Sequence, residues 1–253
     1  MTAPQAPRPA PTATPSARTP SSSAATSLPT PAPGSWTRAE VARLIDHTLL
    51  RPEATAADVE RLCAEAAELG VGAVCVSPSR LPLRAGLLPA GVGVAAVVGF
   101  PSGAHLAGAK AAEAQAAVAC GATEIDMVAN LALVASGAVD ELAAEVERVT
   151  VAVGPTVPVK VILETSLWDP ERIAAACLAA ATGGAAFVKT STGFHPAGGA
   201  SVEAVAVMAA TVGDRLGVKA SGGIRSAADA RRMLEAGATR LGASATAAIL
   251  AGF

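Results

Sequence analysis

The sequence predicts one α/β domain, a (β/α)₈ TIM barrel, preceded by a tail of different composition. From Trp36 onward a short apolar segment is followed by an Ala- and Glu-rich amphipathic segment, and this unit repeats about eight times. Such alternation is typical of parallel strands joined by right-handed helical crossovers. About eight strands favour closure into a barrel. No GxGxxG follows the first predicted strand, which argues against an open dinucleotide-binding sheet.

The predicted strands are apolar runs in which Val, Ile, Leu and Ala dominate. The chain is 51% hydrophobic and 2% aromatic, with no tyrosine, so aliphatic side chains must build the core. Strands of this composition suit a parallel sheet that is buried on both faces. They are expected at residues 44–50, 71–77, 92–100, 123–130, 158–164, 185–191, 217–222 and 239–244.

The predicted helices alternate with these strands, and several have recognisable ends. Thr55 with Asp58, and Ser226 with Asp229, have the spacing of an N-terminal capping box. Several helices run into a glycine, a residue that accepts the left-handed backbone of a helix C-cap. These glycines are Gly70, Gly121, Gly183 and Gly237. The helices are expected near residues 55–69, 104–120, 138–153, 169–182, 201–213, 226–236 and 244–250.

Residues 1–35 differ in composition from the predicted barrel domain at residues 36–253. Pro, Ala, Ser and Thr dominate the first segment, and it has little to bury, so we expect a disordered tail. Arg8 and Arg18, with no acidic residue before Glu40, faintly resemble an organelle transit peptide. The prolines preclude the amphipathic helix that such peptides need, so a dispensable tail is the favoured interpretation.

Composition and charge exclude several classes of partner. The net charge is −2 and Lys and Arg are scattered, so neither nucleic acid nor a membrane is expected as a partner. No apolar run reaches the roughly 18 to 20 residues that span a bilayer. Four distant cysteines indicate reduced thiols in a cytoplasmic protein. The three histidines are isolated in the sequence, and no motif indicates a metal site.

Four charged residues interrupt otherwise apolar strands and are the candidates for catalysis. Asp126 lies in EIDMV, Lys160 in PVKVILE, Lys189 in FVKTSTG and Lys219 in GVKASGG. Buried charge is costly unless it is paired or used, and a (β/α)₈ barrel has its active site at the carboxyl ends of the strands. If the Lys189 and Lys219 side chains point into the barrel, they lie on neighbouring strands near its carboxyl end.

Two lysines beside a carboxylate suit Schiff-base chemistry. A lysine must be neutral to attack a carbonyl, and a nearby cation and a desolvated pocket both favour the neutral form. Asp126 is suited to moving protons as the carbinolamine and imine form. The alternative is that each lysine extends its ammonium group to solvent from a strand end. That alternative is favoured for a single lysine, whereas Lys189 and Lys219 together favour catalysis. The residues alone do not decide which lysine is the nucleophile.

Short glycine-containing loops follow the last three predicted strands and indicate a phosphate site. The segments are TSTG (190–193), SGG (221–223) and GAS (242–244). Glycine lets the backbone approach a ligand closely, and a following helix N-terminus offers free N–H groups to an anion. Barrels that bind phosphate commonly use the loops after strands 7 and 8. A phosphorylated carbonyl compound is therefore the expected substrate.

These segments resemble the deoxyribose-phosphate aldolase family, a family of class I, Schiff-base aldolases. The resemblance runs from about Leu44 to about Leu250, nearly all of the chain after the tail. FVKTSTGF and VKASGGIR, at this separation and with EIDMV upstream, are highly specific. The matching segments are IDHTLL (45–50), VCVSP (74–78), VVGFPSGAH (97–105), EIDMVAN (124–130), KVILET (160–165), FVKTSTGF (187–194), VKASGGIR (218–225) and RLGAS (240–244).

The resemblance implies a role for each candidate residue. Lys189 would be the Schiff-base nucleophile, Lys219 the second lysine that favours its neutral form, and Asp126 the proton-transfer partner of Lys219. The implied reaction is reversible cleavage of 2-deoxy-D-ribose 5-phosphate, in deoxyribonucleotide catabolism, to D-glyceraldehyde 3-phosphate and acetaldehyde. It needs no metal or organic cofactor. A cytoplasmic location and a possible homodimer are also implied. The expected substrate and phosphate contacts are Thr190, Gly193, Gly222, Gly223, Gly242 and Ser244.

Two departures from the family pattern and several alternatives accompany this prediction. Ala245 stands where many relatives have a second serine, and the chain ends at Phe253 without the C-terminal tyrosine of some relatives. The alternatives are a Schiff-base barrel aldolase acting on another phosphosugar, a non-covalent phosphate-binding isomerase or synthase, and a catalytically dead scaffold. The last requires a lesion in the lysine and carboxylate cluster, and the sequence has none.

Overall fold

Eight parallel strands close into a barrel with helices around it, as predicted. The computed structural model describes residues 36–253, so the expected disorder of residues 1–35 lies outside the described residues. Each strand pairs with its neighbours in chain order, and β1 pairs with β8 to close the ring. The strands are β1 (Ile45–Leu49), β2 (Ala73–Val76), β3 (Gly93–Val98), β4 (Glu124–Val128), β5 (Val159–Ile162), β6 (Phe187–Lys189), β7 (Gly217–Ser221) and β8 (Arg240–Ala243).

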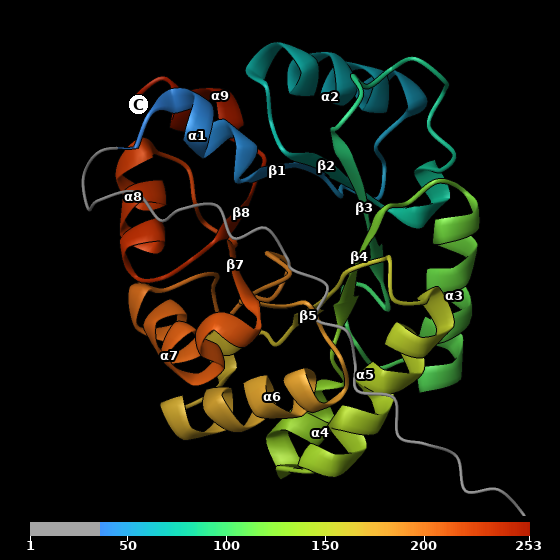
Figure 1. Cartoon of the computed structure of the whole chain (residues 1–253), viewed down its shortest axis with the longest axis vertical. Helices are drawn as coiled ribbons and strands as arrows, with labels where there is room; N and C mark the ends of the chain where they lie inside the picture. Colours follow the sequence, from blue (N-terminus) through green and yellow to red (C-terminus); the bar gives the residue numbers. More distant parts are fainter. Residues whose placement is uncertain (1–35) are drawn as a thin grey trace, which may run out of the picture. The chain divides into compact units, whose positions relative to one another are not determined.

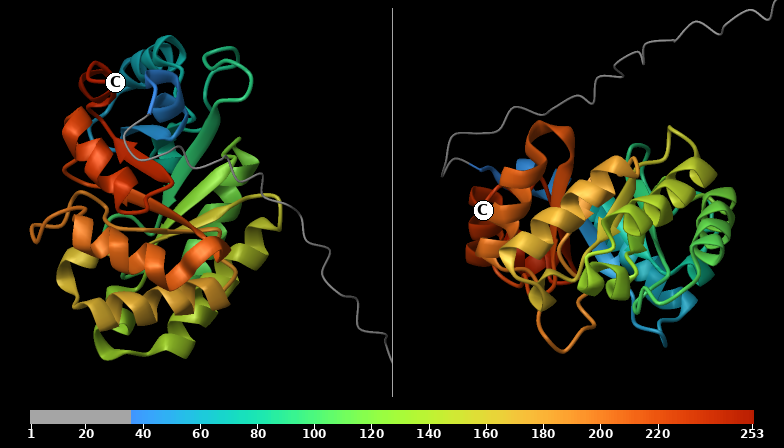
Figure 2. Two further views of the ribbon diagram at one scale, coloured as in Figure 1. Left: turned by 60° about the vertical axis from the view of Figure 1, so that its left-hand side comes forward. Right: turned by 90° about the horizontal axis from the view of Figure 1, so that it is seen from below.

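The helices lie outside the strands in each view (Figures 1 and 2). Seven of them match predicted segments, and the last one, α9, packs against α1 near the start of the described chain. The helices are α1 (Arg38–Arg43), α2 (Ala56–Leu69), α3 (Ala107–Ala119), α4 (Leu131–Ser136), α5 (Val139–Val153), α6 (Pro170–Thr182), α7 (Val202–Val212), α8 (Ala227–Glu235) and α9 (Thr246–Leu250).

The predicted helix ends are confirmed except at one glycine. Thr55 and Asp58, and Ser226 and Asp229, form reciprocal capping boxes. Gly70, Gly121 and Gly237 have positive φ, but Gly183 has φ −75° and its neighbour Gly184 has φ 82°. The prediction for Gly183 was therefore wrong by one residue.

Close packing of two helices explains why residue 183 is nevertheless glycine. A Cβ atom on Gly183 would lie 2.6 Å from both the Ala143 carbonyl oxygen and the Val146 Cβ, which belong to α5. A side chain here would therefore push α6 away from α5. Small residues at helix contacts allow this close approach, and overpacking such a contact is destabilising.

Apolar residues on the outward faces of the strands form the main core. In β4, Ile125 and Met127 are fully buried and belong to the apolar cluster between the strands and the surrounding helices. Their neighbours Glu124 and Asp126 point the other way, because side chains alternate along a strand. The barrel interior beside β4 is therefore polar, while the layer outside this strand is aliphatic.

A buried ion pair ties two helices to the end of β4. The Lys110 ammonium donates to Glu145 Oε1 at 2.8 Å and to the Val128 carbonyl oxygen at 2.8 Å. The Asn130 N–H donates to the other oxygen of Glu145 at 2.8 Å. Each buried charge thus has hydrogen-bonding partners, which such groups require. The pair fixes the carboxyl end of the strand that carries Asp126.

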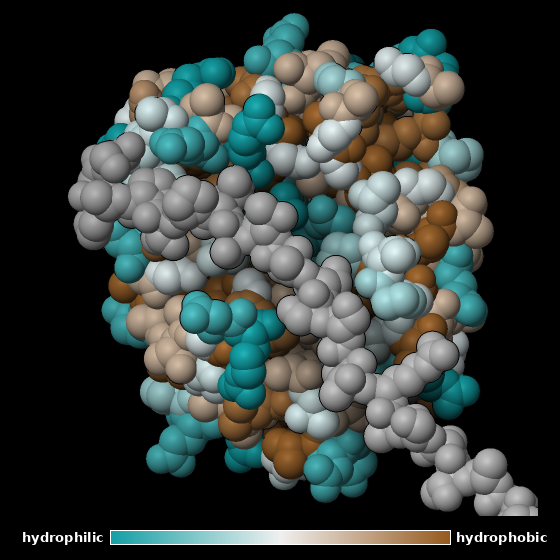
Figure 3. Space-filling view, viewed as in Figure 1, coloured by the Kyte–Doolittle hydropathy of each residue, from teal (hydrophilic) through white to brown (hydrophobic). Residues whose placement is uncertain are grey.

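The surface mixes polar and apolar residues. On the face drawn in Figure 3, hydrophilic residues are interspersed among hydrophobic ones. The exposed large hydrophobic residues of the described chain are Leu106, Val139, Val151, Leu178 and Phe194. Val139 and Val151 lie at opposite ends of α5 and the other three come from other segments, and single exposed apolar residues are normal on a protein surface.

Candidate active site

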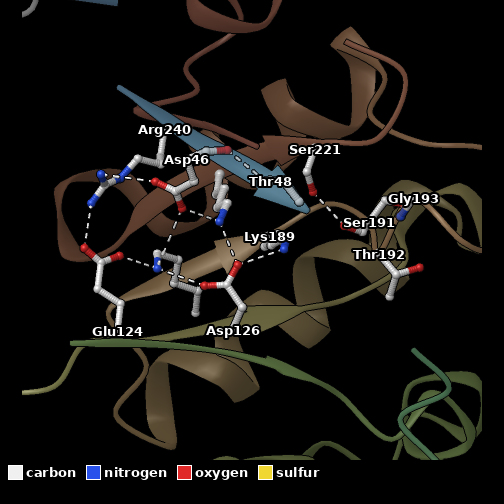
Figure 4. Close-up of polar contacts among 12 residues, drawn as sticks. Asp46, Thr48, Glu124, Asp126, Lys189, Ser191, Thr192, Gly193, Ser221 and Arg240 are labelled. Carbon is white, nitrogen blue, oxygen red and sulfur yellow. Dashed lines mark hydrogen bonds and ion pairs between the residues drawn. The ribbon is translucent and has the colours of Figure 1, made fainter. Parts of the chain in front are cut away.

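Charged side chains from six strands meet inside the barrel (Figure 4). Asp46, Asp126, Lys160 and Lys219 have no exposed surface, and Lys189 is 3% exposed. Lys189 is the last residue of β6, so it lies at the carboxyl end of the barrel, where TIM-barrel enzymes carry their chemistry. The interior charged residues are Asp46, Glu124, Asp126, Lys160, Lys189, Lys219 and Arg240.

Asp126 is the centre of this cluster because it contacts three lysines. Its Oδ1 accepts a hydrogen bond from Lys160 Nζ at 2.8 Å. Its Oδ2 accepts from Lys189 Nζ at 2.8 Å and from Lys219 Nζ at 2.7 Å. Strand register explains the arrangement, since Asp126 pairs with Lys160 and Lys189 pairs with Lys219 on adjacent strands. Of the three residues predicted to be catalytic, Asp126 therefore contacts both lysines.

Asp46 is a member of the cluster that sequence reasoning missed. It hydrogen-bonds Lys219 and lies 3.3 Å from Arg240 Nη1 and 3.9 Å from Lys160 Nζ. The signal was present, because Asp46 interrupts the apolar segment LIDHTLL just as Asp126 interrupts EIDMV. Because Asp46 is buried in β1 beside Lys219, Lys219 has a second carboxylate partner.

Glu124 and Arg240 extend the cluster toward the other end of the barrel. They are the first residues of β4 and β8, and they contact each other at 3.2 Å. Glu124 also contacts Lys160. The carboxylates and cations therefore alternate along the barrel interior, and each of these residues has an oppositely charged neighbour. Sequence reasoning gave neither of them a role.

Glycines in the strands make room for these long side chains. A Cβ atom on Gly242 would lie 3.2 Å from Lys219 Cε and 2.9 Å from Ser221 Cβ. Gly242, which was predicted to contact phosphate, is a residue of β8 and lies beside the Lys219 side chain. On Gly217 a Cβ atom would lie 2.1 Å from the ring of Phe187. The small residues thus permit a charged interior in a narrow barrel.

The cluster shifts the pKa values of two carboxylates and two lysines. Burial alone would raise the pKa of Asp126, but Lys160, Lys189 and Lys219 hold this pKa well below its usual range. The pKa of Asp46 is also lowered, because Lys219 and Lys160 outweigh its burial. Conversely, burial would lower the pKa of Lys219, but Asp126 and Asp46 raise this pKa above its ordinary value. The pKa of Lys160 is raised for the same reason.

The directions of these shifts predict how stability depends on pH. The pKa of Asp126 is lower in the folded than in the unfolded chain, so its ionised form stabilises the fold above the ordinary carboxyl pKa of about 4. This stabilisation is lost as the pH falls through the lowered value. The pKa of Lys219 is raised, so its contribution is complete below the ordinary lysine pKa of about 10.4 and is lost only at higher pH.

We therefore expect a plateau between about pH 5 and about pH 9. The quantity to measure is the difference in unfolding free energy between the parent and Asp126→Asn, by urea denaturation at several pH values. The difference should stay constant across the plateau and shrink below about pH 4. A difference that changes markedly between pH 6 and pH 8 would contradict the charge assignments.

Two loops at the carboxyl end are joined by hydrogen bonds beside Lys189. The Thr190 hydroxyl donates to the Ser221 carbonyl oxygen at 2.9 Å and accepts from the Ser221 N–H at 2.9 Å. The Ser221 hydroxyl donates to the Ser191 carbonyl oxygen at 2.6 Å. Thr190, predicted to contact substrate, is buried with its hydroxyl engaged in this link. Figure 4 shows the charged network on one side of Lys189 and Ser191, Thr192 and Gly193 on the other.

The four remaining predicted phosphate contacts lie in the loops after β6, β7 and β8. Gly193, Gly222 and Gly223 have φ values of 77°, 90° and 83°, a left-handed backbone that favours glycine. Gly193, Gly223 and Ser244 are exposed, and Gly222 is half-buried. Glycine lets an anion approach the backbone of such loops without obstruction by a side chain at that position. The Gly193 N–H donates to the Ser191 hydroxyl at 2.9 Å.

An apolar patch from the first three strands completes the interior of the barrel. Cys75, Ala95 and Val97 are buried here together with Leu50, and Phe100 packs against them. Burial raises the pKa of the Cys75 thiol, so this residue is a protonated apolar side chain at neutral pH. The site therefore combines a charged part, from β4 to β8 and Asp46 of β1, with an apolar part.

Every helix within residues 36–253 is too short or too polar to cross a membrane. In the same part of the chain, His, Cys, Asp and Glu side chains form no group of three that is arranged to hold a metal ion.

Buried lysines and carboxylates at the carboxyl end of a (β/α)₈ barrel, below glycine-rich loops, are typical of a TIM-barrel enzyme. The chain belongs to the DeoC/LacD aldolase family, because the model for "DeoC/LacD family aldolase" matches residues 40–253. It is therefore an aldolase, a carbon–carbon lyase, as the resemblance predicted.

Curated relatives and solved structures agree with the family. The chain is 60% identical to the deoxyribose-phosphate aldolase of Frankia alni, over 85% of this chain and 98% of that protein. It is also 60% identical to that of Corynebacterium diphtheriae, over 85% of this chain and 97% of the relative. The deoxyribose phosphate aldolase of Aeropyrum pernix, described as a unique tetramer, is 36% identical with a TM-score of 0.78, over 86% of this chain and 92% of that one.

Proposed function

We propose that this chain catalyses the reversible aldol cleavage of 2-deoxy-D-ribose 5-phosphate to D-glyceraldehyde 3-phosphate and acetaldehyde, through a Schiff base on Lys189. The family and the names of relatives at 60% identity support the substrate. The observation that carries the mechanism is the environment of Lys189. Lys189 lies at the carboxyl end of the barrel and contacts one carboxylate. The cluster around it contains more cationic than carboxylate side chains.

The charge balance supports Lys189 as the neutral amine. The interior cluster of the described chain contains four cationic and three carboxylate side chains, so full ionisation would leave one surplus positive charge. Lys160 lies within 4 Å of three carboxylates and Lys219 within 4 Å of two. Lys189 has one such partner. A surplus buried charge is costly, so neutral Lys189 gives the balanced state.

In the proposed reaction Lys189 attacks C1 of the open-chain sugar. The carbinolamine loses water to give an iminium, and the C3 hydroxyl then loses its proton as the C2–C3 bond breaks. The bonding electrons move to C2 and into the iminium, which becomes an enamine on Lys189. Protonation of C2 and hydrolysis release acetaldehyde. The iminium is the electron sink, so the mechanism calls for no metal or organic cofactor.

Asp126 and Lys219 are proposed to move the protons. Asp126 Oδ2 is shared by the two amines, at 2.8 Å from Lys189 and 2.7 Å from Lys219. A carboxylate within hydrogen-bonding distance of the nucleophile can transfer protons as the carbinolamine forms and breaks down. Lys219 stays cationic because Asp126 and Asp46 raise its pKa. Its charge beside Lys189 favours the neutral form of the nucleophile.

The phosphate is proposed to bind above the cluster, at the loops after β6, β7 and β8. The candidates with an open approach are Gly193, Gly222, Gly223 and Ser244. Gly193 and Gly222 are close together, because a Cβ atom on Gly193 would lie 3.8 Å from Gly222 Cα. Thr190 and Gly242 contribute by fixing the loops and the position of Lys219.

The proposal is tested by assaying aldehyde release from 2-deoxyribose 5-phosphate and ribose 5-phosphate, with EDTA present throughout. We expect turnover of the deoxy sugar and strong discrimination against ribose 5-phosphate, because a site with no partner for the 2-hydroxyl leaves that group desolvated. No cleavage of the deoxy sugar, together with cleavage of another phosphosugar, would instead favour a related Schiff-base aldolase. Assembly as a homodimer and a cytoplasmic location stay predictions from the family.

A further inference from the structure

Glu164 lies two residues after the end of β5 and has an unusual backbone conformation. Its φ is 54°, and within residues 36–253 it is the one non-glycine residue with a positive φ. A side chain in this left-handed region costs free energy, and strain of this kind clusters at functional sites. The residue is at the carboxyl end of the barrel, beside the loop that begins after Lys189.

The Glu164 carboxylate is buried and only half satisfied. The residue is 1% exposed, and its Oε2 accepts from the Thr192 hydroxyl at 2.7 Å and from the Thr192 N–H at 3.3 Å. Its Oε1 is buried without a hydrogen-bond partner in the described part of the chain. A buried polar atom without a partner is destabilising. Backbone strain and an unpaired buried oxygen both destabilise the fold. A contribution to folding stability therefore does not explain why residue 164 is a glutamate.

The contacts of Glu164 hold the loop that follows β6. The Thr192 hydroxyl, which donates to Glu164, accepts from the Phe194 N–H at 3.1 Å. The Phe194 ring meets the Phe100 ring edge-on, with 5.1 Å between the centroids. Gly193 lies between the two anchored residues and is exposed, and its N–H donates to the Ser191 hydroxyl at 2.9 Å. The segment between β6 and α7 otherwise projects from the domain (Figure 2).

We infer that Glu164 is a positioning residue for binding of the substrate phosphate: it holds Thr192 and Phe194, and so fixes the exposed loop at Gly193 that the anion is proposed to approach. This inference rests on the proposed function. A loop that is ordered before binding loses less conformational freedom when the ligand binds, which strengthens binding. Glu164 acts through Thr192 and is not proposed to touch the reacting atoms.

Glu164→Gly separates this role from a purely structural one. Glycine adopts φ 54° without strain, so the substitution removes the carboxylate while it relieves the backbone. We expect the thermal midpoint to stay the same or rise, while KM for 2-deoxyribose 5-phosphate increases about tenfold, as expected for loss of a hydrogen bond to a charged group. Because the lysine contacts are unchanged, kcat should change by less than about threefold. Glu164→Gln keeps an acceptor oxygen for Thr192 and should retain a KM close to that of the parent.

A matched pair at Thr192 tests the same contact from its other side. Thr192→Val removes the hydroxyl at nearly constant volume and should raise KM as Glu164→Gly does. Thr192→Ser keeps the hydroxyl and should not. If both substitutions remove the same interaction, the double variant Glu164→Gly/Thr192→Val should be no worse than either single variant. This pair also provides the test if Glu164→Gly fails to fold.

The decisive comparison uses 2-deoxyribose, which has no phosphate. For this sugar, kcat/KM should be equal in the parent and in all four single variants. Equal losses on both sugars, or no increase in KM for the phosphorylated sugar, would overturn the positioning role. If the parent cleaves neither sugar, the proposed function has failed. The inference on Glu164 is then tested by titration with inorganic phosphate, which Glu164→Gly should bind about tenfold more weakly than the parent.

Discussion

Replacing Lys189 with methionine is expected to lower kcat by about five orders of magnitude, the scale seen when a covalent nucleophile is removed. Methionine fills similar space but has no amine. Lys219 cannot substitute for it, because its amine is fully buried and contacts two carboxylates that keep it charged. The measurement is steady-state cleavage of 2-deoxyribose 5-phosphate by the purified variant.

Stability provides the control for Lys189→Met. The substitution leaves three cationic and three carboxylate side chains in the described cluster, and Asp126 keeps its contacts with Lys160 and Lys219. The unfolding free energy should therefore change by less than about 1.5 kcal/mol, since no buried charge is left without a partner. A folded variant that retains more than about one hundredth of the parent kcat would contradict covalent catalysis and favour the non-covalent isomerase or synthase.

Asp126→Asn is expected to lower the unfolding free energy by about 3 to 5 kcal/mol and to abolish turnover. The amide has nearly the same shape as the carboxylate, so packing does not account for the loss. With Lys189 neutral, the substitution leaves three cations, Lys160, Lys219 and Arg240, with two carboxylates, Asp46 and Glu124. Urea denaturation at pH 7 measures the stability change.

A second substitution separates the stability effect from the catalytic one. Lys160→Met in the Asp126→Asn background removes one of the unbalanced cations, so it should recover part of the lost stability. Activity should not recover, because Lys189 and Lys219 still lack the oxygen that they share. A single variant that loses less than about 1 kcal/mol would show that the three lysines do not depend on this carboxylate for their burial.

The fold could be predicted because strand and helix patterns alternate along the whole domain. Two short helices escaped this reasoning. The six residues of α4 follow Asn130, whose side chain accepts from the Ala132 N–H and caps the helix. A pattern that expects one helix after each strand does not predict a second one. Likewise α1, which begins after Thr37, precedes the first strand and lies outside the repeated unit.

The catalytic candidates could be predicted because a charge in an apolar strand is conspicuous. The choice between Lys189 and Lys219 could not be made from the residues alone, because it depends on how many carboxylates each amine meets. Those carboxylates include Asp46, which is far from both lysines in the chain and comes to Lys219 only when β1 and β8 close the barrel. Glu164 was hidden for a similar reason, since its partner Thr192 belongs to another loop.

Borohydride reduction in the presence of 2-deoxyribose 5-phosphate, followed by peptide mass mapping, tests the central claim most directly. Reduction converts a Schiff base to a stable secondary amine, so the reacting lysine keeps the mass of the trapped fragment. We predict one modified peptide that carries Lys189 in the parent, the same peptide with EDTA present, and no adduct in Lys189→Met. An adduct on Lys219 or Lys160, or no adduct on any lysine while the sugar binds, would contradict the account.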